Sequence, residues 1–335
     1  MQKKLLTMAV AGALAAPVAA LAQVTVYGSF DAGVKNQSKV VTTAGDDSVL
    51  SIDGQIKKTN RWGLRGSDDL GGGLMANFTL EGGYNADDGQ PNTASGATGI
   101  FNRRSIVGLS KGGNSVNLGR EYTLNFKTQG IYDPLSHDYG GAAGIQGGVG
   151  TAGVRVGNSV TGEFRFGTGG VGVQMGMGEQ AGPTAAGDYT AFNADFAFGP
   201  VTVGAAFGTQ ETTSTTDTTT TSIGAAYKMG AFTFRLGVGT QELDGGNEST
   251  KLSGGVQYDF SPTLTGRVSF YDQATDNAAG TEVATSESFI VNVEYSLSKR
   301  TLVYAVFDRK GFTGTDLTTL RDGATGIGAG IVVNF

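Results

Sequence analysis

The sequence predicts an all-β fold, a sixteen-stranded antiparallel transmembrane β-barrel, on three observations. Apolar and polar residues alternate with a period of two in nearly every segment from Val24 onward. The connections between these segments alternate between short and long, and the last segment ends on an aromatic residue, Phe335. Beyond the N-terminus no apolar run approaches the roughly 20 residues of a transmembrane helix, which excludes a helical membrane protein.

The first 22 residues have the pattern of a secretory signal peptide. Lys3 and Lys4 give a basic start, and Leu5–Ala16 is apolar. Ala20–Ala22 then offers the small residues that a signal peptidase requires. The predicted organisation is therefore a signal peptide at 1–22 and one barrel domain at 23–335 of an exported protein.

The predicted strands each have one apolar and one polar face, because successive side chains point to opposite sides of a strand. A soluble β-sandwich shows the same alternation, but its strands are usually shorter, and here the apolar face persists to the C-terminus. The apolar faces of six segments, in chain order, are Val24/Val26/Phe30/Val34, Phe192/Ala194/Phe196/Phe198, Phe232/Phe234/Leu236/Val238, Leu252/Val256/Tyr258/Phe260, Phe289/Val291/Val293/Tyr295 and Ile327/Ala329/Ile331/Val333/Phe335.

The unequal connections favour a barrel with short turns at one rim and long loops at the other, as in outer-membrane barrels. Short turns are expected at Ser67–Gly73, Lys111–Asn114, Gly167–Gly170, Gly199–Pro200, Gly230–Ala231, Ser261–Thr263 and Ser298–Arg300. Long connections are expected at about Gln37–Gln55, Asn85–Gly99, Glu121–Gly150, Glu179–Gly187, Gln210–Thr220, Leu243–Asn247, Thr275–Thr285 and Lys310–Asp322.

Several segments together resemble the Gram-negative general porins, especially those of betaproteobacteria, including the neisserial porins. These segments are Val24–Gly28, Asp31–Gly33, Asn60–Leu74, Phe78–Tyr84, Phe101–Leu109, Leu118–Thr123, Tyr295–Thr301 and Asn334–Phe335. The resemblance implies a homotrimer of sixteen-stranded channels whose long third loop folds into the lumen. It also implies that the aromatic C-terminus, Phe335, is the signal read by the barrel assembly machinery.

Basic residues are concentrated on the predicted inner wall. Residues at alternate positions share one face of a strand, and this parity places Lys57, Arg61 and Arg65 on one polar face. Together they would form a ladder of basic residues along the wall. By analogy with the family, Arg61, Arg155 and one of Arg103 and Arg104 form a basic cluster; parity favours Arg104, and the choice stays open. Arg120 enters the loop, where parity does not decide. The candidate basic residues of the constriction are Arg61, Arg65, Arg103, Arg104, Arg120 and Arg155.

Acidic residues of the third loop are predicted to oppose these arginines. The loop, at about Glu121–Gly150, contains Glu121, Asp133 and Asp138. Rings of Arg or Lys favour anions, so opposed charges across a narrow gap would set a charge preference. Other residues expected to face the lumen are Lys57, Glu81, Glu163 and Arg165.

We therefore expect a passive outer-membrane diffusion channel for small hydrophilic solutes and ions, with a modest anion preference. The alternative is a substrate-specific porin for anionic solutes such as phosphate or carboxylates. An enzyme is not expected, because the single histidine, His137, lies in a loop and the chain has no cysteine. A plugged structural or adhesive barrel is disfavoured by the mixed charges on the inner face.

The expected partners follow from this interpretation. They are small hydrophilic solutes and ions, outer-membrane lipid, the barrel assembly machinery and two further copies of the chain in a homotrimer. No nucleic acid, cofactor or metal is expected. The expected location is the outer membrane of a Gram-negative bacterium, after removal of the signal peptide.

Overall fold

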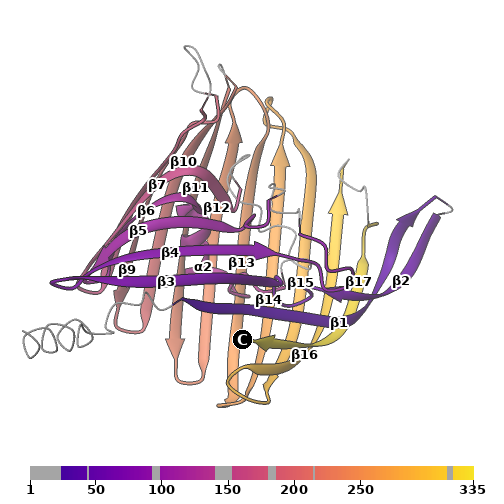
Figure 1. Ribbon diagram of the computed structural model, residues 1–335. Coiled ribbons are helices and arrows are strands. Elements are labelled where there is room, and N and C mark those ends of the chain that lie inside the picture. Colours follow the sequence, from indigo (N-terminus) through magenta and orange to yellow (C-terminus); the bar gives the residue numbers. More distant parts are fainter. Residues whose placement is uncertain are drawn as a thin grey trace, which may run out of the picture.

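The computed structural model describes residues 24–43, 45–92, 99–139, 153–179, 186–213, 216–314 and 320–335. The predicted signal peptide lies outside them, as do residues 140–150 of the predicted third loop. The described chain folds into one antiparallel sheet of seventeen strands with one helix, α2 (Leu124–Tyr132), packed on it (Figure 1). No helix among the described residues is both long and apolar enough to cross a membrane.

The strands follow one another around the sheet nearly in chain order. They are β1 (Thr25–Thr42), β2 (Gly45–Gly54), β3 (Arg61–Gly71), β4 (Leu74–Gly83), β5 (Arg104–Lys111), β6 (Asn114–Tyr122), β7 (Arg155–Phe166), β8 (Gly169–Gly176), β9 (Tyr189–Phe198), β10 (Val201–Thr213), β11 (Thr216–Met229), β12 (Phe232–Leu243), β13 (Glu248–Ser261), β14 (Leu264–Asp276), β15 (Glu282–Ser296), β16 (Thr301–Thr313) and β17 (Ala324–Asn334).

Pairing of the first strand with the last closes the sheet into a barrel. β1 pairs with β17 in antiparallel register from Ser29↔Asn334 to Gln37↔Gly326. Gly28 and Phe335 extend this seam with two backbone hydrogen bonds of 3.0 and 3.1 Å. β2 and β3 both pair with β1, so they occupy one position, and the seventeen segments make sixteen positions around the barrel. The predicted sixteen-stranded antiparallel barrel is confirmed.

The interruption between β2 and β3 is held by a buried carboxylate. Asp31, which is fully buried, accepts the backbone N–H groups of Lys57 and Lys58, both at 2.7 Å. The backbone N–H of Asp31 donates in turn to the side-chain oxygen of Asn60. These contacts replace the ladder hydrogen bonds that residues 55–60 no longer make, so the buried backbone stays paired. The predicted strand face containing Lys57 is therefore corrected: the strand begins at Arg61, and Lys57 lies in the interruption.

The turns at one rim agree with the sequence, whereas two long connections do not. All seven predicted short turns join consecutive strands, but the first, expected at Ser67–Gly73, is shorter because β3 extends to Gly71. The expected loops at 37–55 and 210–220 are wrong, because β1 and β2 extend to Thr42 and Gly45, and β10 and β11 extend to Thr213 and Thr216. The extension of β10 and β11 is polar on both faces, so hydropathy does not alternate there although the hydrogen-bond ladder continues. The extension of β1 and β2 mixes acids with exposed Val49, Leu50 and Ile52, which give no regular alternation.

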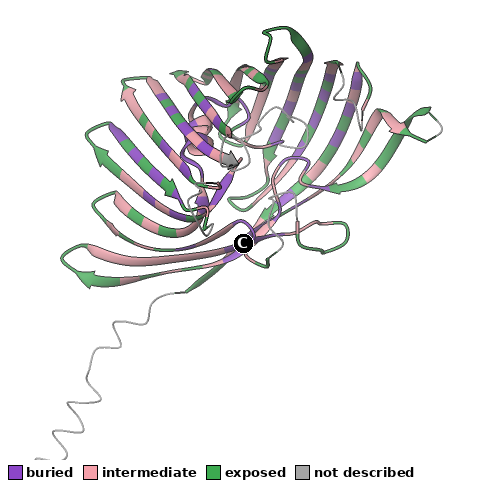
Figure 2. Ribbon diagram, turned by 90° about the horizontal axis from the view of Figure 1, so that it is seen from above, coloured by how far each residue is buried: buried purple, intermediate pink, exposed green. Residues whose placement is uncertain are grey.

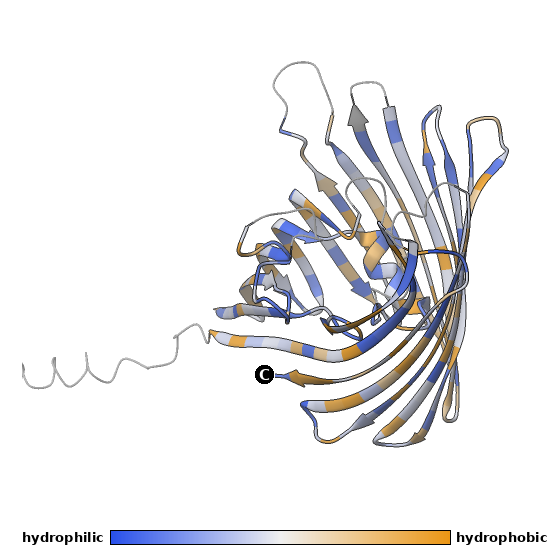
Figure 3. Cartoon of the chain, turned by 90° about the vertical axis from the view of Figure 1, so that its right-hand side faces the viewer, coloured by the Kyte–Doolittle hydropathy of each residue, from blue (hydrophilic) through white to orange (hydrophobic). Residues whose placement is uncertain are grey.

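The two faces of the wall differ as the alternation predicts. Outward side chains are large and apolar; Leu236 is 60 % exposed and Ile223 is 58 % exposed. Inward neighbours such as Thr220 and Ser222 are buried. Buried and exposed residues alternate along strands such as β8 and β17 (Figure 2). Hydrophobic and hydrophilic residues alternate along many of the strands (Figure 3).

Candidate functional site

The helix α2 packs on the inner face of the barrel wall. It begins after β6 at Thr123, whose side chain accepts the N–H of Phe126, and it contacts strands β8 to β12. Two glycines make room for its last residue, Tyr132: a Cβ atom built on Gly224 or Gly237 would lie 2.1 or 2.0 Å from this side chain. Glycine at these two positions therefore fixes how closely the helix approaches the wall.

Three arginines gather around Tyr122, the last residue of β6. Its hydroxyl accepts hydrogen bonds from Arg103 at 2.8 Å and from Arg155 at 3.3 Å. The guanidinium carbons of Arg155 and Arg104 lie 4.7 and 5.7 Å from the centre of its ring. Guanidinium groups are attracted by the face of an aromatic ring. One tyrosine thus holds three positive groups together; we call Arg103, Arg104, Arg155 and Tyr122 the arginine cluster.

Two arginines of this cluster are paired with buried carboxylates. Arg103 binds Glu81, and Arg104 binds Glu121, both at 2.6 Å. Glu81 also accepts the hydroxyl of Tyr27 at 3.0 Å. The structure therefore brings both Arg103 and Arg104 into the cluster, the choice that sequence parity left open. Glu121 is corrected from a loop residue to a buried residue of β6, because this strand extends to Tyr122.

Three arginines of the inner wall, Arg61, Arg65 and Arg155, are not neutralised in this way within the described part of the chain. Among the residues that the structure describes, no carboxylate forms an ion pair with Arg61, Arg65 or Arg155. Arg65 lies over the ring of Tyr27, 5.0 Å from its centre. Arg120 differs from these residues. It lies opposite Ser105 in the strand ladder and is two positions after Leu118, so it points outward as Leu118 does. Its guanidinium donates a hydrogen bond to the carbonyl of Asn102 at 2.9 Å. The structure thus leaves Arg120 outside the arginine cluster.

Lys57 belongs to a buried ionic network and is not part of a basic ladder with Arg61 and Arg65. Its ammonium group lies 2.6 Å from Asp138 and 2.7 Å from Glu294, and only 4 % of the side chain is exposed. Glu294 also pairs with Arg267 and accepts the hydroxyl of Tyr139 at 3.2 Å. The network joins the segment after α2 to β14, β15 and the interruption of the second barrel strand.

Asp133 anchors the same segment at a second point. Its carboxylate accepts the hydroxyl of Tyr271 and the backbone N–H groups of Leu135 and His137. The ring of His137 stacks on Phe126, with 3.9 Å between centres, and its Nε2 lies 2.9 Å from the carbonyl of Phe126. Burial lowers the pKa of His137, which keeps the imidazole neutral at pH 7.

The last two predicted lumen residues take part in ion pairs on the inner wall of β7. Glu163 binds Lys127 of α2 at 2.7 Å. Arg165 binds Asp195 of β9 at 2.6 Å, close to the short-turn rim, and is half exposed. An exposed pair of this kind contributes little to stability.

No pattern in the sequence indicates which tyrosines organise the site. Tyr122, Tyr139 and Tyr271 come from β6, the segment after α2 and β14, and they meet charged groups from other strands. Their roles depend on which strand positions face one another across the interior, and a period-two pattern does not encode that information.

Replacing Tyr122 with Phe will loosen the arginine cluster. The ring stays, but Arg103 and Arg155 lose their shared acceptor, and hydrogen bonds to charged groups contribute about 1.5–3 kcal/mol. We expect a lower unfolding temperature of the purified protein in detergent. Tyr84→Phe is the control, because the hydroxyl of Tyr84 donates to an uncharged group, the carbonyl of Ser29, at 3.3 Å. Equal unfolding temperatures for the two variants would contradict an organising role of Tyr122.

Compared with protein families and with individual proteins, the sequence gives matches of both kinds. The family model described as Gram-negative porin matches residues 7–315. Outer membrane porin protein 32 of Delftia acidovorans is 42 % identical over 138 residues, which are 41 % of this chain and 36 % of that protein. An outer membrane porin of Bordetella pertussis is 34 % identical over 154 residues, which are 42 % of this chain and 39 % of that one. The matched segments thus span less than half the length of these relatives.

Solved structures match over nearly the whole chain. An anion-selective porin from Comamonas acidovorans superposes with a TM-score of 0.77 and 25 % identity, covering 94 % of this chain and 100 % of that one. The trimer form of an outer membrane protein of Vibrio cholerae superposes with a TM-score of 0.72 and 15 % identity, covering 93 % and 99 %. The second likeness concerns the fold alone.

Proposed function

Because this chain belongs to the Gram-negative porin family, we propose that it forms a passive, water-filled channel through the outer membrane for small hydrophilic solutes and ions. Family and fold indicate a channel rather than an enzyme. Solutes would diffuse along the inner face of the barrel and past α2, which packs on that face and would narrow the opening.

A modest preference for anions is the second part of the proposal. The observation that carries it is the set of inner-wall arginines without a carboxylate partner in the described chain, namely Arg61, Arg65 and Arg155. The acids that the sequence places opposite them are engaged: Asp138 by Lys57, and Asp133 by Tyr271 and backbone N–H groups. The name of the Comamonas acidovorans protein, an anion-selective porin, supports the same direction.

Single-channel recording tests this function directly. The purified protein in a planar bilayer should give stepwise KCl conductance, and a KCl gradient should give a zero-current potential on the anion-selective side. A channel with cation preference in dilute salt would contradict the selectivity, and the absence of conductance steps would contradict the channel itself.

We further propose a homotrimer, as in the trimer form of the Vibrio cholerae protein. Outward aromatic rings gather near the short turns of β7 and of β9 to β13, where Phe166, Phe196, Phe232 and Tyr258 form ring contacts. Aromatic residues favour the membrane interface. The outer faces of β5 and β6 carry aliphatic side chains instead, and this sector is suited to contact with another subunit.

The ends of the chain have proposed roles in delivery to the membrane. Residues 1–22 would direct export and be removed. Phe335, which is half exposed on the outer side of the closing seam, would be the residue that the assembly machinery reads.

A further inference from the structure

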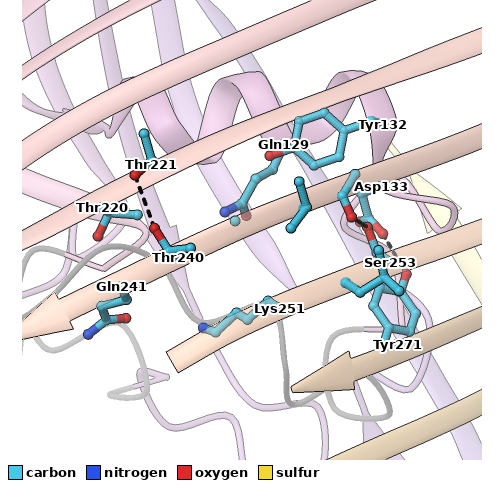
Figure 4. A pocket seen from close by; sticks show the side chains of 14 residues that line it. Gln129, Tyr132, Asp133, Thr220, Thr221, Thr240, Gln241, Lys251, Ser253 and Tyr271 are labelled. Atoms are coloured by element: carbon cyan, nitrogen blue, oxygen red, sulfur yellow. Dashed lines mark hydrogen bonds between the residues drawn. The ribbon is translucent and has the colours of Figure 1, made fainter. Parts of the chain in front are cut away.

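A cavity lies between α2 and the inner wall of β11 to β14, on the far side of the helix from β6. Figure 4 shows Gln129, Tyr132 and Asp133 reaching it from the helical segment, and Thr220, Gln241, Lys251, Ser253 and Tyr271 from the wall. It has about 550 Å³ of empty space, part of it open to solvent. None of the arginine cluster lines this cavity.

The strand register brings three polar side chains together at one end of the cavity. Thr220 of β11 lies directly opposite Gln241 of β12. Lys251 of β13 lies opposite Gly239, which is two positions before Gln241, so its long side chain is within reach of the same point. Gly239 has no side chain to occupy the space between them.

One buried group at this end points to a ligand. Thr220 is only 6 % exposed, and its hydroxyl has no hydrogen-bond partner. An unpaired buried hydroxyl has a free-energy cost of about 1–3 kcal/mol, which a ligand oxygen would remove. Lys251 supplies a positive charge beside this hydroxyl, and the amide of Gln129 faces it from the helix (Figure 4).

The other end of the cavity is lined by the rings of Tyr132 and Tyr271, with Asp133 and Ser253 between them (Figure 4). The ring of Tyr132 packs on the backbone of Gly237, where a Cβ atom would lie 2.0 Å from it. The carboxylate of Asp133 accepts hydrogen bonds from the hydroxyl of Tyr271 and from two backbone N–H groups. A cationic and hydrogen-bonding end joined to an aromatic end is the arrangement of a small-ligand site.

We propose that this cavity binds small monocarboxylates with an apolar or aromatic tail. The carboxylate would take hydrogen bonds from the ammonium of Lys251, the hydroxyl of Thr220 and an amide N–H of Gln241 or Gln129, and the tail would lie against the tyrosine rings. Inorganic phosphate suits the site less well, because its remaining oxygens would face the aromatic end without donors. The proposal rests on the proposed channel, through which the solute reaches the cavity.

Benzoate is the probe for this site. Single channels of the full-length protein are recorded in symmetrical KCl while benzoate is added, and the concentration that halves the chloride current is measured. Benzamide, which has the same shape without the charge, should block much more weakly. Lys251→Met and Thr220→Val should each raise the half-blocking concentration of benzoate, the first by at least about tenfold, since it removes a charged hydrogen-bond partner.

Lys228→Met is the matched control. Lys228 also faces inward from β11, but it is exposed at the short-turn rim, away from the cavity. The substitution therefore removes one inward positive charge without changing the site. Equal effects of Lys228→Met and Lys251→Met, block by benzamide as strong as by benzoate, or no block at all in a conducting wild-type channel would each overturn the proposal. A protein without KCl conductance would instead contradict the channel function, so the two failures are distinguishable.

Discussion

Replacing Arg61 and Arg155 together with glutamine will shift the zero-current potential in a KCl gradient towards that of a cation-selective channel. Both side chains lack an ion-pair partner in the described chain, so their charge acts on passing ions rather than on a carboxylate. One charge at 4 Å is worth about 1 kcal/mol even in bulk water, and a wall of low dielectric strengthens it. We therefore expect the anion-to-cation permeability ratio to fall by about fivefold or more.

The double variant Glu81→Gln and Arg103→Gln is the control for this experiment. It removes one charge of each sign from an ion pair at 2.6 Å and so leaves the net charge unchanged. Its zero-current potential should stay near that of the wild type. If Arg61→Gln with Arg155→Gln had no effect on selectivity, the acids of the segment after α2 would be the controlling charges instead.

The exposed acids explain why net charge is a poor guide here. The chain carries −6 at pH 7, yet many of its acids, such as Asp46, Asp88 and Glu282, are exposed near or beyond the strand ends. Screening acts over about 8 Å at physiological salt, so these charges contribute little at the narrowest point. Charges on the inner wall beside α2 act at short range.

The fold was predictable from the sequence because lipid imposes a strict alternation. Leu236 and Arg235 are neighbours that face opposite sides of β12, and hydropathy alone separates them. The interruption at 55–60 was not predictable, because it depends on Asp31 of the neighbouring strand accepting two backbone N–H groups. That contact joins residues 26 and 27 positions apart and leaves no periodic pattern.

The site was predictable in its residue types but not in its pairing. The inner-wall positions of Arg61, Arg65 and Arg155 follow from parity. The neutralisation of Arg104 by Glu121 does not, because it requires the register of β5 against β6 and the length of β6. Lys57 shows the same limit. The sequence places its positive charge on the inner wall, but Asp138 and Glu294 neutralise it through ion pairs.

Leu236→Arg will destabilise the barrel, whereas Thr233→Arg on the same strand will fold. Leu236 is 60 % exposed on the outer face of β12. It lies about 17 Å along the strand from the turn at Gly230–Ala231. Because barrel strands are tilted, this position is near the middle of the roughly 25 Å apolar band. An arginine facing lipid at that depth costs about 2–4 kcal/mol. Thr233 faces inward, where an arginine meets water and lies between Gln257 and Lys228 of the two paired strands.

The measurement is reversible unfolding in guanidinium from lipid vesicles, with electrophoretic heat modifiability as a check on folding. Leu236→Arg should lower the free energy of unfolding by about 2–4 kcal/mol. Thr233→Arg should stay within about 1 kcal/mol of the wild type, because a substitution on the watery side has no lipid-facing charge to desolvate. Equal losses in the two variants would mean that the faces of β12 do not meet different solvents. Since Arg235 and Gly237 share the parity of Thr233, such a result would also remove the basis for placing the inner-wall charges in water.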